Sequence, residues 1–355
     1  MVTIGDVARR AGVARATVSH ALSGKRPVAA ETRERVLAAV RELDYHPNAA
    51  ARSLTSRRIR AVGLALPLDF YGDALPEGPF FGFIAHAADR LGQHDHKLLC
   101  LISREPDPSE LVQLARTGYV DGLLLLQVRL HDRRIAPLRA TGLPFVLIGR
   151  PRDAGGLVCV DADMATAAEL AVRHLAGLGH RRIALLTASG DDGPVYGFQY
   201  HALAGFERAY QTLNLPFDGG QILSYDPACG PHTALRPLLD DLSNNGGESE
   251  GSASSAGFTA LITTTDLEAA VALRLLAERG RRVPDDLSLV TLGDSVLMEL
   301  AQPPVTAVRF SVGAETHAAV DALMSLLAGD PSPHEQLIPV ELLPRCSTRS
   351  IVDSR

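Results

Sequence analysis

The segment from Thr3 to Leu22 constrains this chain most, because it predicts two short helices joined by a tight turn. Thr3 and Asp6 have the T-x-x-D spacing of a capping box, in which two side chains satisfy the free amides of a helix start. Gly12 follows the first run of helical apolar periodicity, and glycine tolerates the left-handed backbone that a sharp turn often needs. A second helix is predicted after Val13. The pattern is typical of a helix-turn-helix, although an ordinary helical hairpin fits the spacing too.

A third helix is predicted over residues 31–43, where apolar residues recur at helical spacing. Two short helices cannot enclose a core, and the third supplies the missing wall. Asn48 follows Pro47 and is a favourable residue at a helix start, so residues 49–54 could form about a turn and a half of helix. The apolar side of the third helix comprises Val36, Leu37, Val40 and Leu43.

Three strings in this region closely resemble the DNA-binding headpiece and hinge of the lac repressor/galactose repressor (LacI/GalR) family. They are DVARRAGVARATVSHALSG (6–24), VAAETRERVLAAVRELDYHPN (28–48) and AARSL (50–54), and a weaker resemblance continues through the rest of the chain. The resemblance implies a helix-turn-helix headpiece over 1–46, a hinge over 47–59, and an effector-binding and dimerisation core over 60–355. Ala14 and Ala29 stand where the family usually has Ser or Thr at a helix start, and each such alanine costs about 1 kcal/mol of stability.

The resemblance also implies which residues contact DNA. Arg15 would pair with guanine O6 and N7, a contact worth about 1–3 kcal/mol of discrimination, or would alternatively contact a phosphate. In the family a hinge leucine, here Leu54, is wedged into the central base step from the minor groove; the alternative is an exposed linker leucine. The expected DNA-binding residues are Thr3, Arg15, Ala16, Thr17, His20, Asn48, Ala51, Arg52 and Leu54.

Charge is distributed unevenly along the chain. Residues 1–60 contain 12 Lys and Arg against 5 Asp and Glu, a net charge of +7, whereas the remainder contains 23 against 36, a net charge of −13. A cationic head suits contact with phosphates, and DNA repels an acidic body. The predicted hinge helix is marginal by itself, since isolated helices need roughly 12–15 residues. We therefore expect the hinge to fold only when a dimer and DNA hold it, and an effector that moves the subdomains to melt it.

From Arg60 onward, short apolar runs alternate with helical patterns, which is typical of an α/β fold with doubly wound parallel sheets. Two successive runs of this kind predict two subdomains with a cleft between them, and the resemblance implies a periplasmic-binding-protein-like core. Its three crossings are expected near 158–161, 292–294 and 325–329. These give an N-subdomain of about 60–158 and 294–325 and a C-subdomain of about 159–292 and 328–345. The Gly/Ser-rich stretch 244–257 is predicted to be a mobile surface insertion.

The residues that match the family's effector site keep its aromatic members but lose several polar ones. Ala202, Thr265, Gly293 and Phe310 stand where polar anchors are usual. Sugar hydroxyls left unpaired in such a site would cost about 1–3 kcal/mol each. The sequence therefore predicts a less polar or differently charged effector; the alternatives are a sugar-like ligand held by other residues, such as Tyr196, Tyr200 and His201, or no small effector. The expected effector residues are Phe80, Phe81, Tyr200, Ala202, Tyr225, Thr265, Asp266, Gly293, Asp294 and Phe310.

An enzyme and a periplasmic solute-binding protein are the competing classes of protein. The chain has no P-loop, H-E-x-x-H or G-x-G-x-x-G motif and no apolar run of about 18 residues, and we expect it to carry no signal peptide. Four cysteines without metal-ligand spacing are predicted to be buried free thiols in a reducing compartment: Cys100, Cys159, Cys229 and Cys346. We therefore expect a cytoplasmic, operator-binding transcription regulator, a repressor, without cofactor or metal. No heptad repeat follows Arg345, which favours a homodimer over a tetramer.

Overall fold

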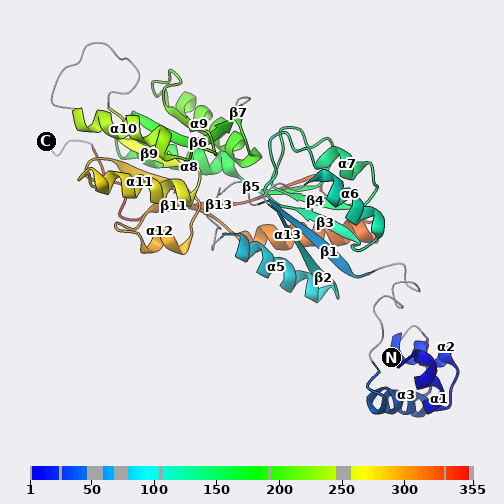
Figure 1. Ribbon diagram of the computed structural model, residues 1–355. Helices are drawn as coiled ribbons and strands as arrows, with labels where there is room; N and C mark the ends of the chain where they lie inside the picture. Colours follow the sequence, from blue (N-terminus) through cyan, green and yellow to red (C-terminus); the bar gives the residue numbers. More distant parts are fainter. Residues whose placement is uncertain are drawn as a thin grey trace. The chain divides into compact units, whose positions relative to one another are not determined.

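The computed structural model describes residues 2–23, 26–45, 59–67, 79–103, 107–190, 193–244, 257–331 and 333–351. They form two compact units, Met1–Ile59 and Arg60–Arg355 (Figure 1). Four expected DNA-binding residues of the hinge, Asn48, Ala51, Arg52 and Leu54, lie outside the described residues. So does most of the Gly/Ser-rich stretch.

The first unit contains the three predicted helices, α1 (Ile4–Ala11), α2 (Arg15–Ser23) and α3 (Ala30–Glu42). The capping box is confirmed, because the backbone amide and the hydroxyl of Thr3 both donate to Asp6 Oδ2, at 2.8 and 2.7 Å. The left-handed turn is confirmed too, since Gly12 has φ 63°. Ala29 caps α3 without a side-chain hydrogen bond, as its missing hydroxyl requires.

One small apolar cluster holds these helices together. Val7, Val18 and Val36 are fully buried at its centre, one from each helix. Leu37 is only half-buried and lies outside this cluster, contrary to the predicted periodicity. Tyr45, which follows α3, closes the cluster instead, and its backbone amide donates to Val40 O at 2.9 Å. The remaining buried members are small, Ala8, Ala11, Ala21 and Ala39, so the helices can approach closely.

The second unit contains two sheets, as the α/β pattern predicts (Figure 1). The first is parallel throughout, in the order β12 (Glu335–Ile338), β5 (Cys159–Ala162), β4 (Phe145–Ile148), β3 (Gly122–Leu125), β1 (Ala61–Pro67), β2 (Lys97–Ser103). The second has the order β13 (Val340–Leu343), β11 (Thr306–Phe310), β10 (Ser288–Leu292), β9 (Ala260–Thr263), β6 (Ile183–Gly190), and β6 also pairs with β7 (Gly193–Pro194) and β8 (Ile222–Tyr225). Only β13 and β7 run antiparallel to their neighbours among the described strands.

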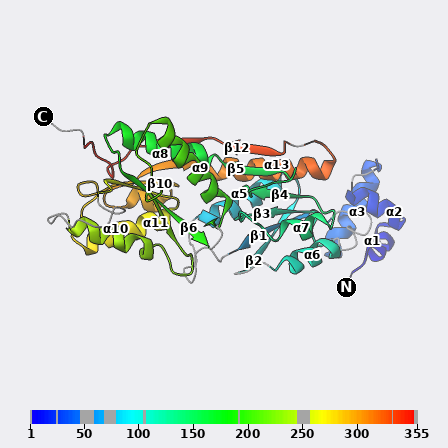
Figure 2. The ribbon, with the colours of Figure 1, turned by 90° about the horizontal axis from the view of Figure 1, so that it is seen from above.

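Helices cover both faces of each sheet, so the doubly wound prediction is confirmed (Figures 1 and 2). On the first sheet, α5 (Pro79–Gln93) and α13 (Val312–Ala328) cover one face, and α6 (Pro108–Thr117) and α7 (Ile135–Arg139) the other. On the second sheet, α8 (Met164–Gly177) and α9 (Gly197–Thr212) cover one face, and α10 (His232–Asn244), α11 (Asp266–Glu278) and α12 (Val296–Leu300) the other.

The crossings between the two sheets differ from those expected. The chain leaves the first sheet after β5, at residue 163, slightly later than predicted. The expectations near 292–294 and 325–329 are wrong, because β11 pairs with β10 and β12 pairs with β5. The crossings therefore fall at Ser311 and between Ile338 and Val340. A short apolar strand does not carry in its own sequence the identity of the sheet that will hydrogen-bond to it.

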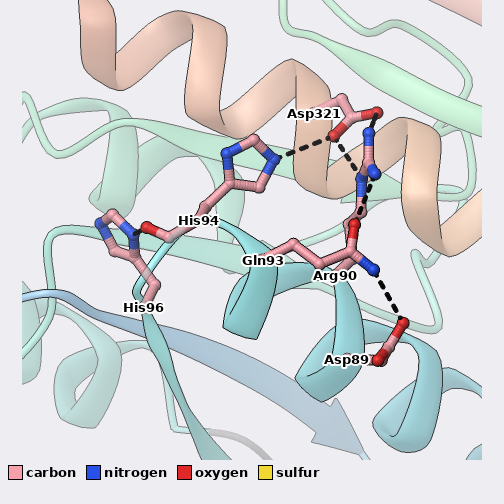
Figure 3. A network of polar contacts seen from close by, with 6 residues as sticks. All are labelled: Asp89, Arg90, Gln93, His94, His96 and Asp321. Carbon is pink, nitrogen blue, oxygen red and sulfur yellow. Dashed lines mark hydrogen bonds and ion pairs between the residues drawn. The ribbon is translucent and has the colours of Figure 1, made fainter.

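Two covering helices of the first sheet, α5 and α13, are joined by the polar network in Figure 3. Arg90 donates two hydrogen bonds to the Asp321 carboxylate, from Nε to Oδ1 at 2.8 Å and from Nη2 to Oδ2 at 2.7 Å. His94 Nε2 lies 3.4 Å from Asp321 Oδ1, and Arg90 Nη1 also donates to Gln93 Oε1 at 2.7 Å. The bidentate geometry fixes the orientation of the two helices as well as their separation.

All four cysteines are free, but the prediction that they are buried is wrong for three of them. Only Cys159 is buried, and its burial raises the pKa of its thiol to about 12. Cys100, Cys229 and Cys346 are exposed, because their strand edge and loops leave one side uncovered. In the described part of the chain, no helix has the length and apolar content needed to cross a membrane.

Candidate functional site

The second helix of the first unit presents one exposed side. Arg15 and Ala16 are exposed, Thr17 and His20 are half-buried, and Val18 points into the core. The same 3.6-residue repeat that buries Val18 therefore turns the expected base-reading residues outward. The resulting surface is a short helix whose first residues project from a fixed core.

Two acidic side chains of this unit form ion pairs with arginines of α1 and not with Arg15. Asp6 is paired with Arg9, and Glu42 accepts from Arg10 Nη2 at 2.6 Å. Within residues 2–23 and 26–45, no carboxylate pairs with Arg15. Arg15 lies instead against Gly5 of α1, where an added Cβ would come within 2.9 Å of its Nη2. Thr3 is exposed, but its hydroxyl already donates to Asp6.

In the second unit, the carboxyl ends of the strands of the second sheet bring several expected effector residues close to one another. Tyr225 ends β8, Thr265 follows β9, and Gly293 and Asp294 follow β10. These strands are neighbours through β6 and β9, so their ends share one edge of the sheet. Ligands of open α/β sheets bind outside this edge.

A buried carboxylate that the sequence analysis did not single out, Glu268, organises part of this edge. It accepts a hydrogen bond from the Tyr225 hydroxyl at 2.8 Å and from the backbone amides of Thr264 and Thr265, at 2.6 and 3.0 Å. Burial raises the pKa of Glu268 to about 7, and the hydrogen bonds oppose that rise. The T-x-x-E spacing from Thr265 to Glu268 is a capping-box signal and could have identified this residue.

The position of the Asp266 carboxylate requires a residue without a side chain at Gly293. Asp266 Oδ2 accepts from the Ser295 backbone amide at 3.0 Å, and Thr291 Oγ1 lies 3.5 Å from Oδ1. Burial raises the pKa of Asp266 above its ordinary value. Gly293 has φ 153°, and a Cβ there would lie 2.8 Å from Asp266 Oδ1. The missing side chain at Gly293 therefore makes room for the carboxylate of Asp266.

Asp294 is neutralised by a residue of its own subdomain. Arg345 Nη2 lies 2.7 Å from Asp294 Oδ1, and both side chains are largely buried. Arg345 also donates through Nη1 to Val305 O at 2.8 Å, so it is fixed from two sides. No sequence pattern predicts this pair, because its members lie far apart in the chain on different segments.

The other expected effector residues do not join this edge as a group. Ala202 is fully buried between α8 and α9, where Gly205 approaches the Ala165 carbonyl so closely that an added Cβ would lie 2.1 Å away. Such close helix packing leaves Ala202 no open face for a ligand, contrary to expectation. Phe80 lies in the core of the first sheet, whereas Phe81 is 72% exposed. Phe310 packs half-buried against the core of the second sheet.

The residues expected to replace lost polar contacts have different environments. Tyr196 is fully buried at the start of α9. Tyr200 is half-buried, with the Arg152 guanidinium 5.9 Å from its ring centre and the His201 ring 5.3 Å away. Burial lowers the pKa of His201 to about 4, so its imidazole is neutral at pH 7. Of these three, His201 has a buried nitrogen, Nε2, without a hydrogen-bond partner in the described structure.

The start of α9 joins the two subdomains by backbone contacts that the sequence did not predict. The Gly197 amide donates to Val128 O at 3.1 Å, and the Leu130 amide donates to Val195 O at 3.0 Å. A Cβ on Gly197 would lie 1.6 Å from the Arg150 carbonyl oxygen, so only glycine permits this approach. A ligand that moves one subdomain against the other must disturb these contacts.

Comparison with known proteins gives matches over both units. Residues 3–48 match the model of bacterial regulatory proteins of the lacI family, and residues 172–348 match the periplasmic binding protein-like domain. The transcriptional regulator MalR of Streptomyces coelicolor is 31% identical, over 99% of this chain and 98% of its own length. A solved complex of the transcriptional regulator CelR with cellobiose is 26% identical, with a TM-score of 0.69 over 98% of this chain and 100% of that one. The lac repressor dimer bound to operator and an anti-inducer has a TM-score of 0.80 at 23% identity, over 98% of this chain and 99% of that one.

Proposed function

This chain belongs to the lacI family of bacterial transcriptional regulators, and from that premise we propose that it is a repressor that binds a pseudo-palindromic operator as a homodimer. A small effector bound at the strand ends of the second sheet controls the binding. The single observation that carries the proposal is the outer face of α2 on the three-helix core, where Arg15 is exposed and Thr17 and His20 are half-buried.

The position of these side chains suits reading of the major groove. A recognition helix contacts base edges through its N-terminal residues, and Arg15, Ala16 and Thr17 are the first three residues of α2. His20 lies one turn further along the same helix. Arg15 and His20 can donate to guanine acceptors, and the methyl groups of Ala16 and Thr17 suit the methyl group of thymine.

Binding to a twofold duplex tests the proposal. A fluorescently labelled palindromic duplex with a central C-G step, chosen from a library with randomised half-sites, is titrated with the full chain and with the 60–355 fragment. We expect two full chains per duplex, an affinity that falls steeply with salt, and at least about a thousandfold preference over a scrambled duplex. The fragment should not bind. Equal affinity for the scrambled duplex would overturn the proposal.

An exposed apolar surface on the second subdomain supports the dimer. Val296, Leu297 and Leu300 of α12 are 65%, 63% and 72% exposed. Leu267, at the start of the neighbouring α11, is exposed as well. Clustered exposed apolar side chains mark association surfaces, and a twofold operator calls for two copies of the same chain. The proposed occupant of this surface is therefore a second copy.

The hinge supplies a second contact, through Leu54. We expect Leu54→Ala to lower affinity for the twofold duplex by at least about tenfold and to abolish the bend, because an apolar wedge holds unstacked base pairs open. Gel mobility of circularly permuted duplexes measures the bend. Ile59→Ala, which truncates an exposed apolar residue at the last position of the hinge segment, is the control and should change neither. An unchanged bend in Leu54→Ala would exclude the wedge.

The effector we propose is less polar than a sugar. The CelR relative was solved with cellobiose, but here Asp294 is held by Arg345, and Asp266 by Ser295 and Thr291. Sugar hydroxyls would have to compete with these internal partners. Thr263 Oγ1, at the end of β9, is a buried hydroxyl without a partner in the described structure, and it can receive one polar group of a ligand. Thermal-shift screening of the 60–355 fragment should favour less polar ligands over mono- and disaccharides.

The remaining parts of the proposal follow from the regulator's role. The protein acts in the cytoplasm, where its DNA is, and catalyses no reaction. The described residues contain no group of three or more side chains suited to a metal ion. A G-x-S-x-G string, which in hydrolases surrounds a nucleophilic serine, occurs at 247–251. It lies in the Gly/Ser-rich stretch and outside the described residues.

A further inference from the structure

We infer that Gly5 is a positioning residue for Arg15 and thereby sets part of the base preference of the DNA-binding unit. The inference rests on the proposed role of Arg15 in reading DNA. It concerns a residue of α1, whose own contact with DNA it does not require.

The guanidinium of Arg15 occupies the space that a side chain at residue 5 would need. A Cβ built on Gly5 would lie 2.9 Å from Arg15 Nη2, 3.0 Å from Nε and 3.2 Å from Cζ. Cζ is the farthest of the three atoms, so the edge of the guanidinium that carries Nε and Nη2 is the part nearest to this position. Gly5 is buried although it occupies the first turn of α1, and Arg15 lies directly over it.

The contact holds the guanidinium without using its hydrogen-bond donors. The nearest acidic side chain in sequence to Gly5, Asp6, accepts from Thr3 and pairs with Arg9. In the described part of this unit, no carboxylate pairs with Arg15. The donors of the fork therefore stay available for guanine or phosphate acceptors. An arginine that is confined before binding loses less rotamer freedom when it binds, which raises both affinity and selectivity.

An alanine at this position would displace the guanidinium but not the helix. Real Cβ atoms essentially never come within 3.0 Å of another heavy atom, and the atoms that the added methyl group would meet belong to a flexible side chain. Gly5 is helical, so alanine suits its backbone better than glycine does. Gly5→Ala should therefore keep or raise the melting temperature while it moves Arg15 off α1.

A double-mutant cycle on the full chain tests the inference. Wild type, Gly5→Ala, Arg15→Ala and the double variant are titrated against the tightest-binding twofold duplex, and against duplexes changed at each half-site base pair. We expect Gly5→Ala to lower affinity roughly fivefold and to relax discrimination at the same base pair that Arg15→Ala relaxes. In the Arg15→Ala background, Gly5→Ala should have no further effect. Gly92→Ala is the matched control, since a Cβ there meets nothing within 4 Å.

The outcomes separate this inference from the proposed function. If Arg15→Ala leaves affinity and base preference unchanged, the proposed reading by Arg15 fails. If Arg15→Ala weakens binding but Gly5→Ala does not, the positioning role of Gly5 is wrong and the function stands. If Gly5→Ala weakens binding equally in both backgrounds, Gly5 acts by another route, and the inference is overturned. Circular dichroism of each variant confirms that the helices are retained.

Discussion

Arg15→Ala should lower affinity for the tightest-binding twofold duplex by about ten- to a hundredfold, the loss that a bidentate arginine–guanine contact accounts for. Arg15 is exposed at the first position of α2, and no carboxylate in the described part of its unit pairs with it. Its removal therefore breaks no internal ion pair that is seen there, and the effect should appear in binding rather than in stability. Fluorescence anisotropy at two or more salt concentrations measures the affinity.

The sequence dependence of the loss decides what Arg15 contacts. If Arg15 contacts a base, Arg15→Ala should abolish the discrimination between base pairs at one position of each half-site. If Arg15 contacts a phosphate, the variant should lose the same affinity for every duplex, and the slope of log affinity against log salt concentration should become smaller by about one. Arg35→Ala is the matched control, because Arg35 is exposed on α3 and carries the same charge away from α2. It should weaken all duplexes slightly and alike. A uniform loss for Arg15→Ala would assign Arg15 to the DNA backbone.

The parts of this fold that could be predicted from the sequence are those fixed by neighbouring residues. The capping box at Thr3 and Asp6, the turn at Gly12 and the amphipathic helices depend on spacings of a few positions, and the structure confirms them. The alternation of apolar runs and helices predicted two doubly wound sheets for the same reason. Short-range patterns suffice wherever the physical cause is itself short-range.

The features that escaped prediction depend on partners far away in the chain. The sheet that holds β11 is set by its pairing with β10 and β13, and nothing in the strand itself records that choice. Ala202 was predicted to replace a polar ligand anchor, but the close packing of α8 and α9 places it in the core. The Asp294–Arg345 pair likewise joins two separate segments. The arrangement at the strand ends of the second sheet was therefore predicted less well than the helix-turn-helix of the first unit.

Glu268→Ala should reduce the free energy of unfolding of the core by about 3–5 kcal/mol, the size expected when a buried polar hub is removed. The Tyr225 hydroxyl and the amides of Thr264 and Thr265 would each lose their acceptor in a region that water does not reach. Urea unfolding of the 60–355 fragment measures the loss. Glu278→Ala, an exposed residue of the same helix, should change stability by less than about 0.5 kcal/mol. Tyr225→Phe, which removes one donor, should cost about 1 kcal/mol.

The pH dependence of the same measurement identifies the protonation state of Glu268. Its pKa is about 7 in the fold, against 4.5 as the ordinary value, so folding takes up a proton between these two pH values. The stability due to Glu268 is therefore complete below about pH 4.5 and is lost as pH rises through about 7. The Thr264 hydroxyl donates to the two carboxyl oxygens at 3.1 and 3.0 Å, which favours the ionised form and opposes the effect of burial without cancelling it. The difference in stability between wild type and Glu268→Ala should consequently shrink from pH 5 to pH 8. Parallel pH profiles would mean that Glu268 is ionised in the fold, held by its donors against the effect of burial.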